Sequence, residues 1–287
     1  MMQYQAPSSP AGRHGRFGAT GLRDRRAALL LCSAMAVLSG FASVPAHAQI
    51  LSSGPYFADT LYAQDYNVNT VVRPEHAAGK RAPTPTATFV FNFIGNFPVA
   101  AREAFTKAGE IWATYLQADT INVDASWDSL GASTLGTAGP RLVSFSGAPF
   151  PDTWYASALA ESMAGENFTG SRADIVATFN SQFPDWYFGT EGNPPPNKYD
   201  LVTVVLHELG HGLGFVGSFD ITDDDPENGQ QDCPNTEVAG MGCWGIPTNN
   251  TPTQILPMVF DRFTEDQNNK ALLNTNVYPN PSTALAD

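Results

Sequence analysis

The chain has 287 residues, with 15 basic against 28 acidic side chains and a formal net charge of −13. An acidic balance of this size repels nucleic acid and anionic membrane surfaces, and it suits a soluble exported protein. The sequence contains neither a nucleic-acid-binding motif nor an internal repeat, so we expect no nucleic-acid partner and no repeat architecture.

The first 48 residues predict an export signal. Arg23, Arg25 and Arg26 form a basic region, residues 27–42 form an apolar region, and Ala46-His47-Ala48 is typical of a cleavage site. Cleavage after residue 48 would leave 239 residues with 10 basic and 27 acidic side chains. We therefore expect a secreted or periplasmic, monomeric protein of one domain, without a membrane anchor once the signal is removed.

The mature part predicts an irregular segment followed by one folded domain. Residues 49–86 are expected to be a pro-segment or a linker, with Lys80-Arg81 as a candidate processing site, and residues 87–287 the domain. The predicted elements are strands over 88–93, 121–127, 141–145 and 173–180 and helices over 98–115, 152–164 and 201–213. Their order predicts an α/β (α+β) fold with a mixed, mostly parallel twisted sheet, a backing helix and a final helix that carries the site.

The final predicted helix contains His207-Glu208-Leu209-Gly210-His211 after an N-cap at Asp200. Residues four apart share one helix face, so both imidazoles can reach one metal ion. The opposite side carries an apolar stripe of Val202, Leu206, Leu209 and Leu213. The H-E-x-x-H pattern is typical of zinc metallopeptidases, in which the two His residues bind Zn²⁺ and the Glu acts as general base.

Residues 207–215, HELGHGLGF, resemble the zincin metallopeptidases of the metzincin type, including a group of secreted bacterial zincins with this same sequence. The resemblance implies a zincin-like domain in which Gly214 lets the chain turn beneath the metal toward a third ligand. It also implies that residues 173–179 form the edge strand that binds the substrate backbone as an added strand. Met258 is the candidate for a methionine turn below the metal, although a Met in an apolar run is more often ordinary core.

The motif leaves the third metal ligand open. The family places a His three residues after the Gly, and Gly217 stands at that position here. Catalytic zinc usually takes three protein ligands and leaves a fourth position for water. Asp220 is the first candidate for the third ligand because it lies just beyond the turn. The other candidates are His76, Asp223, Asp224, Asp225, Glu227 and Asp261.

Two further features follow the motif. The acidic run over residues 220–232 is a candidate Ca²⁺ loop, but it lacks the Gly that an EF-hand turn needs, so a solvated acidic loop is favoured. Cys233 and Cys243 are the two cysteines that remain after removal of the signal. In an oxidising compartment they predict one disulfide.

These residues predict a secreted zinc-dependent endopeptidase that acts on polypeptides. His207 and His211 are expected to hold Zn²⁺, and Glu208 to take a proton from the attacking water and pass it to the leaving amine. Tyr278 is a candidate for stabilising the oxyanion. Two alternatives remain open: a non-catalytic binding or adhesion module on a zincin fold, and a zinc hydrolase of non-peptide amides or esters.

Overall fold

The computed structural model describes residues 48–64, 66, 85–222, 233–234, 236, 238–249 and 254–286. All of them belong to one compact unit, Ser43–Asp287. The other unit, Met1–Ala42, lies outside the described residues together with the predicted export signal. None of the described helices combines the length and the hydropathy of a segment that crosses a membrane.

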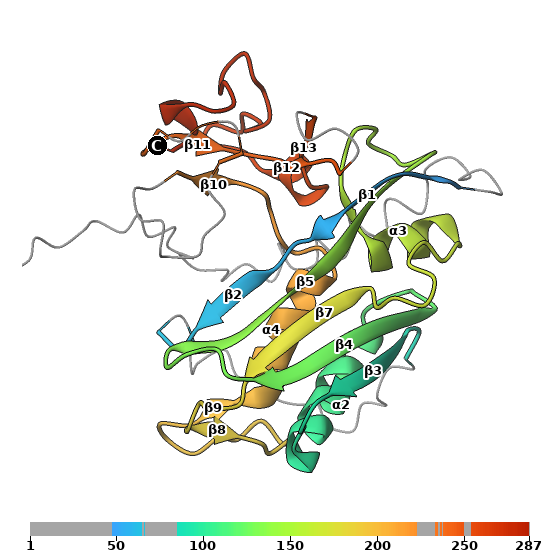
Figure 1. Ribbon diagram of the computed structural model, residues 1–287, viewed down its shortest axis with the longest axis vertical. Coiled ribbons are helices and arrows are strands. Elements are labelled where there is room, and N and C mark those ends of the chain that lie inside the picture. Colours follow the sequence, from blue (N-terminus) through green and yellow to red (C-terminus); the bar gives the residue numbers. More distant parts are fainter. Residues whose placement is uncertain are drawn as a thin grey trace, which may run out of the picture. The chain divides into compact units, whose positions relative to one another are not determined.

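A mixed seven-stranded sheet organises the unit (Figure 1). Its main path follows the order β1 (Ile50–Tyr56), β5 (Thr134–Phe145), β7 (Ile175–Asn180), β4 (Thr120–Asp128) and β3 (Thr88–Ile94). Two short strands, β2 (Asp59–Tyr62) and β6 (Tyr155–Ala156), also pair with β5. The mixed sheet is confirmed, but the expectation that it is mostly parallel is wrong. Only β3–β4 and β4–β7 pair in parallel among the described strands of this sheet, because β5 runs against each of its neighbours.

Three α-helices are described: α2 (Val99–Ala113), α3 (Ser157–Ala164) and α4 (Leu201–Gly212). They confirm the predicted helices, although α3 starts later than expected because β6 occupies residues 155–156. Smaller elements complete the described chain: β8 (Trp186–Tyr187), β9 (Tyr199–Asp200), β10 (Asp220–Ile221), β11 (Gly242–Cys243), β12 (Ile246–Pro247), β13 (Ile255–Leu256), η3 (Phe260–Phe263) and η4 (Thr283–Leu285).

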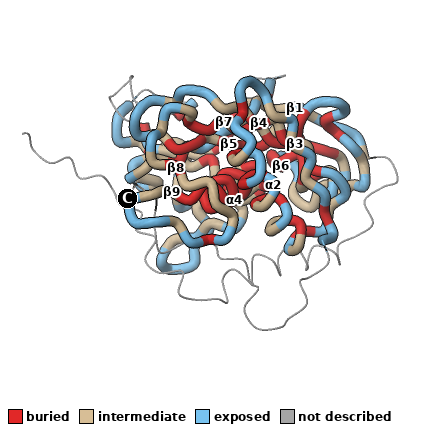
Figure 2. The backbone as a smooth tube through the Cα atoms, turned by 90° about the horizontal axis from the view of Figure 1, so that it is seen from below, coloured by how far each residue is buried: buried red, intermediate tan, exposed pale blue. Residues whose placement is uncertain are grey.

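The main core lies between the sheet and the pair of helices α2 and α4, and Figure 2 shows the buried residues gathered around α4 and the strands beside it. Phe105 of α2 is fully buried and meets Phe91 of β3 and Phe179 of β7 edge-to-face, with ring centroids 5.7 and 4.7 Å away. Aromatic rings in this geometry gain about 0.5–1.5 kcal/mol per pair beyond the burial of their area. This packing therefore anchors α2 on the sheet, beside α4.

Residues 50–62 form strands instead of the irregular structure expected of residues 49–86. β1 pairs with the C-terminal half of β5, and β2 pairs with its N-terminal half. Leu61 is buried in the main core. At Gly54 an added Cβ would lie 3.1 Å from the ring of Trp154, so the glycine permits close packing. The first part of the predicted pro-segment or linker is thus a component of the sheet, while the candidate processing site Lys80-Arg81 lies outside the described residues.

The strand order also contradicts the prediction that residues 173–179 form an edge strand for substrate. β7, which covers most of residues 173–179, lies inside the sheet between β5 and β4. The outer edge of β5 is covered by β1 and β2. A strand with partners on both sides has no free backbone groups to offer, so residues 173–179 cannot bind a substrate strand as expected.

Candidate functional site

The motif lies on α4, and the sequence explains locally why this helix forms and where it ends. Asp200 caps the helix by accepting a hydrogen bond from the amide of Thr203 at 2.9 Å. The predicted apolar stripe, Val202, Leu206, Leu209 and Leu213, is buried. Gly212 allows close contact with β7, because a Cβ there would overlap the side chain of Ile175. After the helix, Gly214 has a φ of +104°, which makes the turn predicted at this position.

His207 and His211 face one another from successive turns of α4. Their Nε2 atoms are 2.9 Å apart. Nδ1 of His211 lies 3.0 Å from the carbonyl oxygen of Phe215, which can only accept, so the proton of a neutral His211 is on Nδ1 and its Nε2 carries a lone pair. Desolvation, followed by the charge of His211, lowers the pKa of His207 to about 4. We refer to these two residues as the histidine pair.

Glu208 is fully buried, and neither of its carboxylate oxygens has a hydrogen-bond partner. Its side chain lies between α4 and the sheet, where a Cβ added to Gly136 of β5 would be 3.4 Å from its Cγ. Burial, and then the charge of Asp59, raise the pKa of Glu208 well above its usual value of 4.5, and the nearby backbone of Ala138 and Leu61 lowers it only in part. A buried carboxyl without a partner is expensive for the fold, which makes Glu208 a candidate for a functional role.

Two side chains near the motif were missed by the sequence analysis. Asp59 of β2 places its Oδ2 3.8 Å from Nε2 of His211. Tyr56 of β1 donates its hydroxyl to the carbonyl of Val176 at 2.7 Å. Burial, and then the charge of Glu208, raise the pKa of the Tyr56 phenol. The strand-forming residues Tyr56-Phe57 and Leu61-Tyr62 were a usable signal for these two strands.

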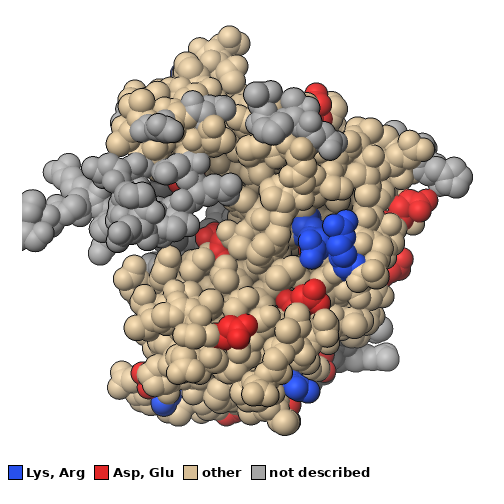
Figure 3. Space-filling model, viewed as in Figure 1, with Lys and Arg blue, Asp and Glu red and all other residues tan. Residues whose placement is uncertain are grey.

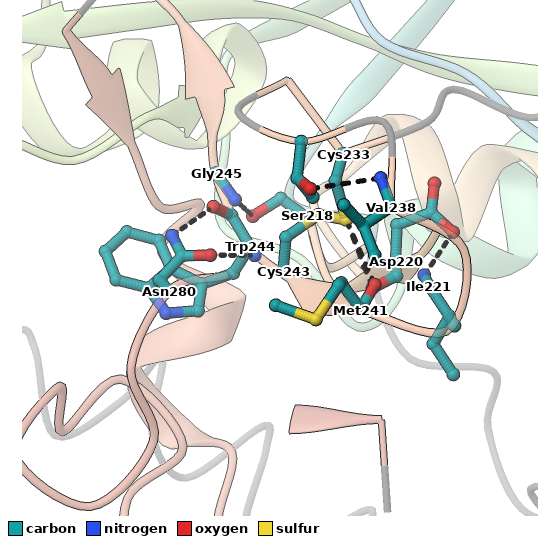
Figure 4. Close-up of a disulfide and its surroundings, with 11 residues drawn as sticks. Ser218, Asp220, Ile221, Cys233, Val238, Met241, Cys243, Trp244, Gly245 and Asn280 are labelled. Atoms are coloured by element: carbon teal, nitrogen blue, oxygen red, sulfur yellow. Dashed lines mark hydrogen bonds between the residues drawn. A yellow bond between two sulfur atoms is a disulfide. The ribbon is translucent and has the colours of Figure 1, made fainter. Parts of the chain in front are cut away.

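Asp220, the first candidate for the third ligand, is not brought to the histidine pair. It lies in β10 opposite Cys243 of β11, and its Oδ1 accepts a hydrogen bond from the amide of Ile221 at 2.8 Å. The predicted disulfide between Cys233 and Cys243 is confirmed, with Cα atoms 5.7 Å apart. Figure 4 shows Asp220 beside this disulfide, with its carboxylate turned to Ile221. Asp220 therefore belongs to the disulfide-linked hairpin.

Asp261 has a structural position. Its carboxylate is fully buried and accepts hydrogen bonds from the amides of Ser218 and Met258, at 2.9 and 2.7 Å, and from the hydroxyl of Ser218. A Cβ on Gly217 would lie 2.8 Å from Oδ1 of Asp261, so a side chain at this position would displace the buried carboxylate. Asp261 thus links Ser218, in the segment after α4, to Met258, in the segment before η3.

The remaining predicted site residues lie elsewhere or outside the described chain. Met258 is fully buried in a cluster with Trp154 and Val216, as ordinary core. The hydroxyl of Tyr278 donates to Asp266 at 2.7 Å. His76, Asp223, Asp224, Asp225 and Glu227, and most of the candidate Ca²⁺ loop with them, lie outside the described residues.

Within the part of the chain that the structure describes, no three His, Cys, Asp or Glu side chains already surround a single point as metal ligands would. On the face drawn in Figure 3, the described acidic side chains are scattered, the basic ones form one small patch and a few isolated positions, and most of the surface is uncharged. The described part of this face therefore offers no extended basic surface for nucleic acid.

Comparison with known proteins gives one partial match. A family model described as SPBPB7E8-like matches residues 165–230. This stretch contains β7 and α4, and with them His207, Glu208 and His211. No curated protein and no solved structure matches the chain. The match covers less than half of the chain, so it does not by itself assign the chain to a family.

Proposed function

We propose that the protein is an exported zinc-dependent endopeptidase whose site is built on α4. One observation carries the proposal: the Nε2 atoms of the histidine pair lie 2.9 Å apart, beside a fully buried glutamate without a hydrogen-bond partner on the same helix. A core helix has no use for an unpartnered carboxylate, which costs stability. A metallopeptidase requires one as its general base.

The residues present fit a zinc ion. Two imidazole nitrogens this close need a proton or a cation between them, because facing lone pairs repel. The hydrogen bond from Nδ1 of His211 to the carbonyl of Phe215 orients the ring, as acceptors at the other ring nitrogen of metal-bound His residues commonly do. His207 and His211 would hold the ion as neutral ligands, and the low pKa of His207 favours its neutral form. Bound zinc would supply Lewis-acid polarisation of the scissile carbonyl and of the attacking water.

Glu208 performs the proton transfers. It takes a proton from the attacking water, and its raised pKa lets it hold this proton until the leaving amine accepts it. The surrounding strands cover its carboxylate, so catalysis requires the side chain to turn toward the histidine pair. Among the described strands, β2 pairs with β5 alone, so the outer edge of β2 is the backbone edge where an extended peptide can be added as a strand.

The test is metal content together with hydrolysis of casein for the full chain and for its Glu208→Ala and His211→Ala variants. We expect about one zinc per chain in the parent and in Glu208→Ala, with hydrolysis only in the parent. His211→Ala should lose both zinc and hydrolysis. Zinc without hydrolysis in the parent would favour a binding module. A parent that cleaves small amides or esters but no peptide library would favour a non-peptide hydrolase, and a parent without zinc would refute the proposal.

A further inference from the structure

β2 brings a carboxylate to the histidine pair from a distant part of the chain. Oδ2 of Asp59 is 3.8 Å from Nε2 of His211, and its charge also acts on His207 and Glu208. The position of Asp59 is set by the sheet, because the residue stands opposite Ala138 in the register of β2 with β5. Figure 1 shows β2 alongside the N-terminal half of β5, and β2 contacts α4.

The backbone of this segment is fixed while the carboxylate of Asp59 can turn. The carbonyl of Asp59 accepts a hydrogen bond from the hydroxyl of Thr137 at 2.7 Å, and Leu61 is buried in the main core. Further along, the hydroxyl of Tyr66 accepts a hydrogen bond from the amide of Asp200, at the start of α4. The Asp59 side chain is 52% exposed, and its Oδ1 accepts a hydrogen bond from the amide of Thr60. Oδ2 is the oxygen that faces His211.

We propose that Asp59 is the third protein ligand of the metal held by His207 and His211, an inference that rests on the proposed function. Ligand atoms on one tetrahedral zinc, with bonds of about 2.0–2.1 Å, are about 3.3 Å apart. The separations of 2.9 Å between the histidines and 3.8 Å from Asp59 to His211 differ from this by about half an ångström each. A small turn of the half-exposed carboxylate closes the difference between Asp59 and His211.

The other described carboxylates near the motif in sequence are placed for other roles. Asp220 lies in the disulfide-linked hairpin, and Asp261 holds Ser218 and Met258. Two imidazoles and one carboxylate form a common ligand set of catalytic zinc, which leaves a fourth position for water. Asp59 completes this set. Residues 50–62 therefore belong to the site and are not removed from the active protein.

The experiment measures zinc affinity, by competition with a chelator, in the full chain and in Asp59→Ala, Asp59→Asn and Asp59→His. Asp220→Ala is the matched control, since it removes the carboxylate first expected as ligand. We expect Asp59→Ala and Asp59→Asn to lose more than about 100-fold in affinity, because loss of a group that only hydrogen-bonds to a metal ligand already costs about 10–100-fold. Asp59→His should retain zinc, because imidazole can replace the carboxylate, and Asp220→Ala should match the parent.

Asp59→Asn preserves the size and the Thr60 contact of the side chain, so it decides the question if Asp59→Ala fails to fold. Parent-like zinc affinity in Asp59→Asn would overturn the inference and leave the proposed function standing. Parent-like affinity with increased hydrolysis would identify Asp59 as a carboxylate that blocks the site. A parent chain without zinc would overturn the proposed function itself. Loss of zinc in Asp220→Ala, with zinc retained in Asp59→Ala, would return the ligand role to Asp220.

Discussion

Two fully buried carboxylates, one on α4 and one in η3, have opposite surroundings. Asp261 accepts hydrogen bonds from two backbone amides and one hydroxyl, whereas Glu208 accepts none. Burial raises the pKa of both groups; the hydrogen bonds of Asp261 offset part of this increase, and the nearby backbone of Ala138 and Leu61 offsets part of it at Glu208. The same chemical group at the same depth is therefore satisfied in one region and left without partners in the other.

Under the proposed function, the difference separates a structural carboxylate from a functional one. Donors around a buried carboxylate stabilise its charged form and repay the cost of burial. A carboxylate that must exchange a proton with water cannot have all its acceptor positions occupied by fixed hydrogen-bond donors. The C-terminal region thus uses Asp261 to hold its chain together, while α4 carries Glu208 at the expense of stability, as functional sites often do.

The largest effect is expected from Glu208→Gln, which tests the functional side of the comparison. Hydrolysis should fall by about 10²–10⁴-fold, the usual contribution of a general acid–base group. The free energy of unfolding should not fall, because the amide removes a buried charge without losing any hydrogen bond. Urea denaturation in the presence of a chelator measures the free energy of unfolding, and a peptide assay without the chelator measures hydrolysis. A loss of more than about 1 kcal/mol in stability would make Glu208 a structural residue.

Asp261→Ala tests the structural side and should act in the opposite way. Removal of the carboxylate leaves the buried amides of Ser218 and Met258 without acceptors, which should cost about 3 kcal/mol in the free energy of unfolding. Activity per folded molecule should change little. Glu103→Ala, at an exposed carboxylate of α2, is the control and should leave the denaturation midpoint close to that of the parent. Unchanged stability in Asp261→Ala would refute the structural role.

The smallest effect expected is on the pH dependence of stability. A carboxyl whose pKa is higher in the folded than in the unfolded state binds its proton more tightly when folded. Its stabilising contribution is complete below the unfolded value, about 4.5 for Glu208, and is lost as the pH rises through the folded value. Metal-free parent protein should therefore lose stability with rising pH. Glu208→Gln should remove more of this slope than Asp261→Asn; equal slopes in parent and Glu208→Gln would contradict the assigned pKa direction.

Much of the helical part of the site could be predicted because its determinants are local. The cap at Asp200, the apolar stripe and the spacing of His207 and His211 all lie within α4 and its boundary, and the structure confirms the helix they predict. The Cys233–Cys243 pairing followed from cysteine count. Two predictions about the sheet were wrong: that it is mostly parallel and that residues 173–179 lie at its edge. Strand order depends on pairing between distant segments, which local sequence patterns do not determine.

The sequence by itself determined the helix, the histidine pair and the glutamate between them, since helical periodicity places residues four apart on one face. Only the tertiary structure decided that β1 and β2 cover the edge of β5, that Asp59 meets His211, and that Glu208 lacks the donors that Asp261 has. The physical reason is the range of the contacts. Pairing between strands and the satisfaction of buried groups depend on segments that are distant in the chain and meet only when the sheet forms.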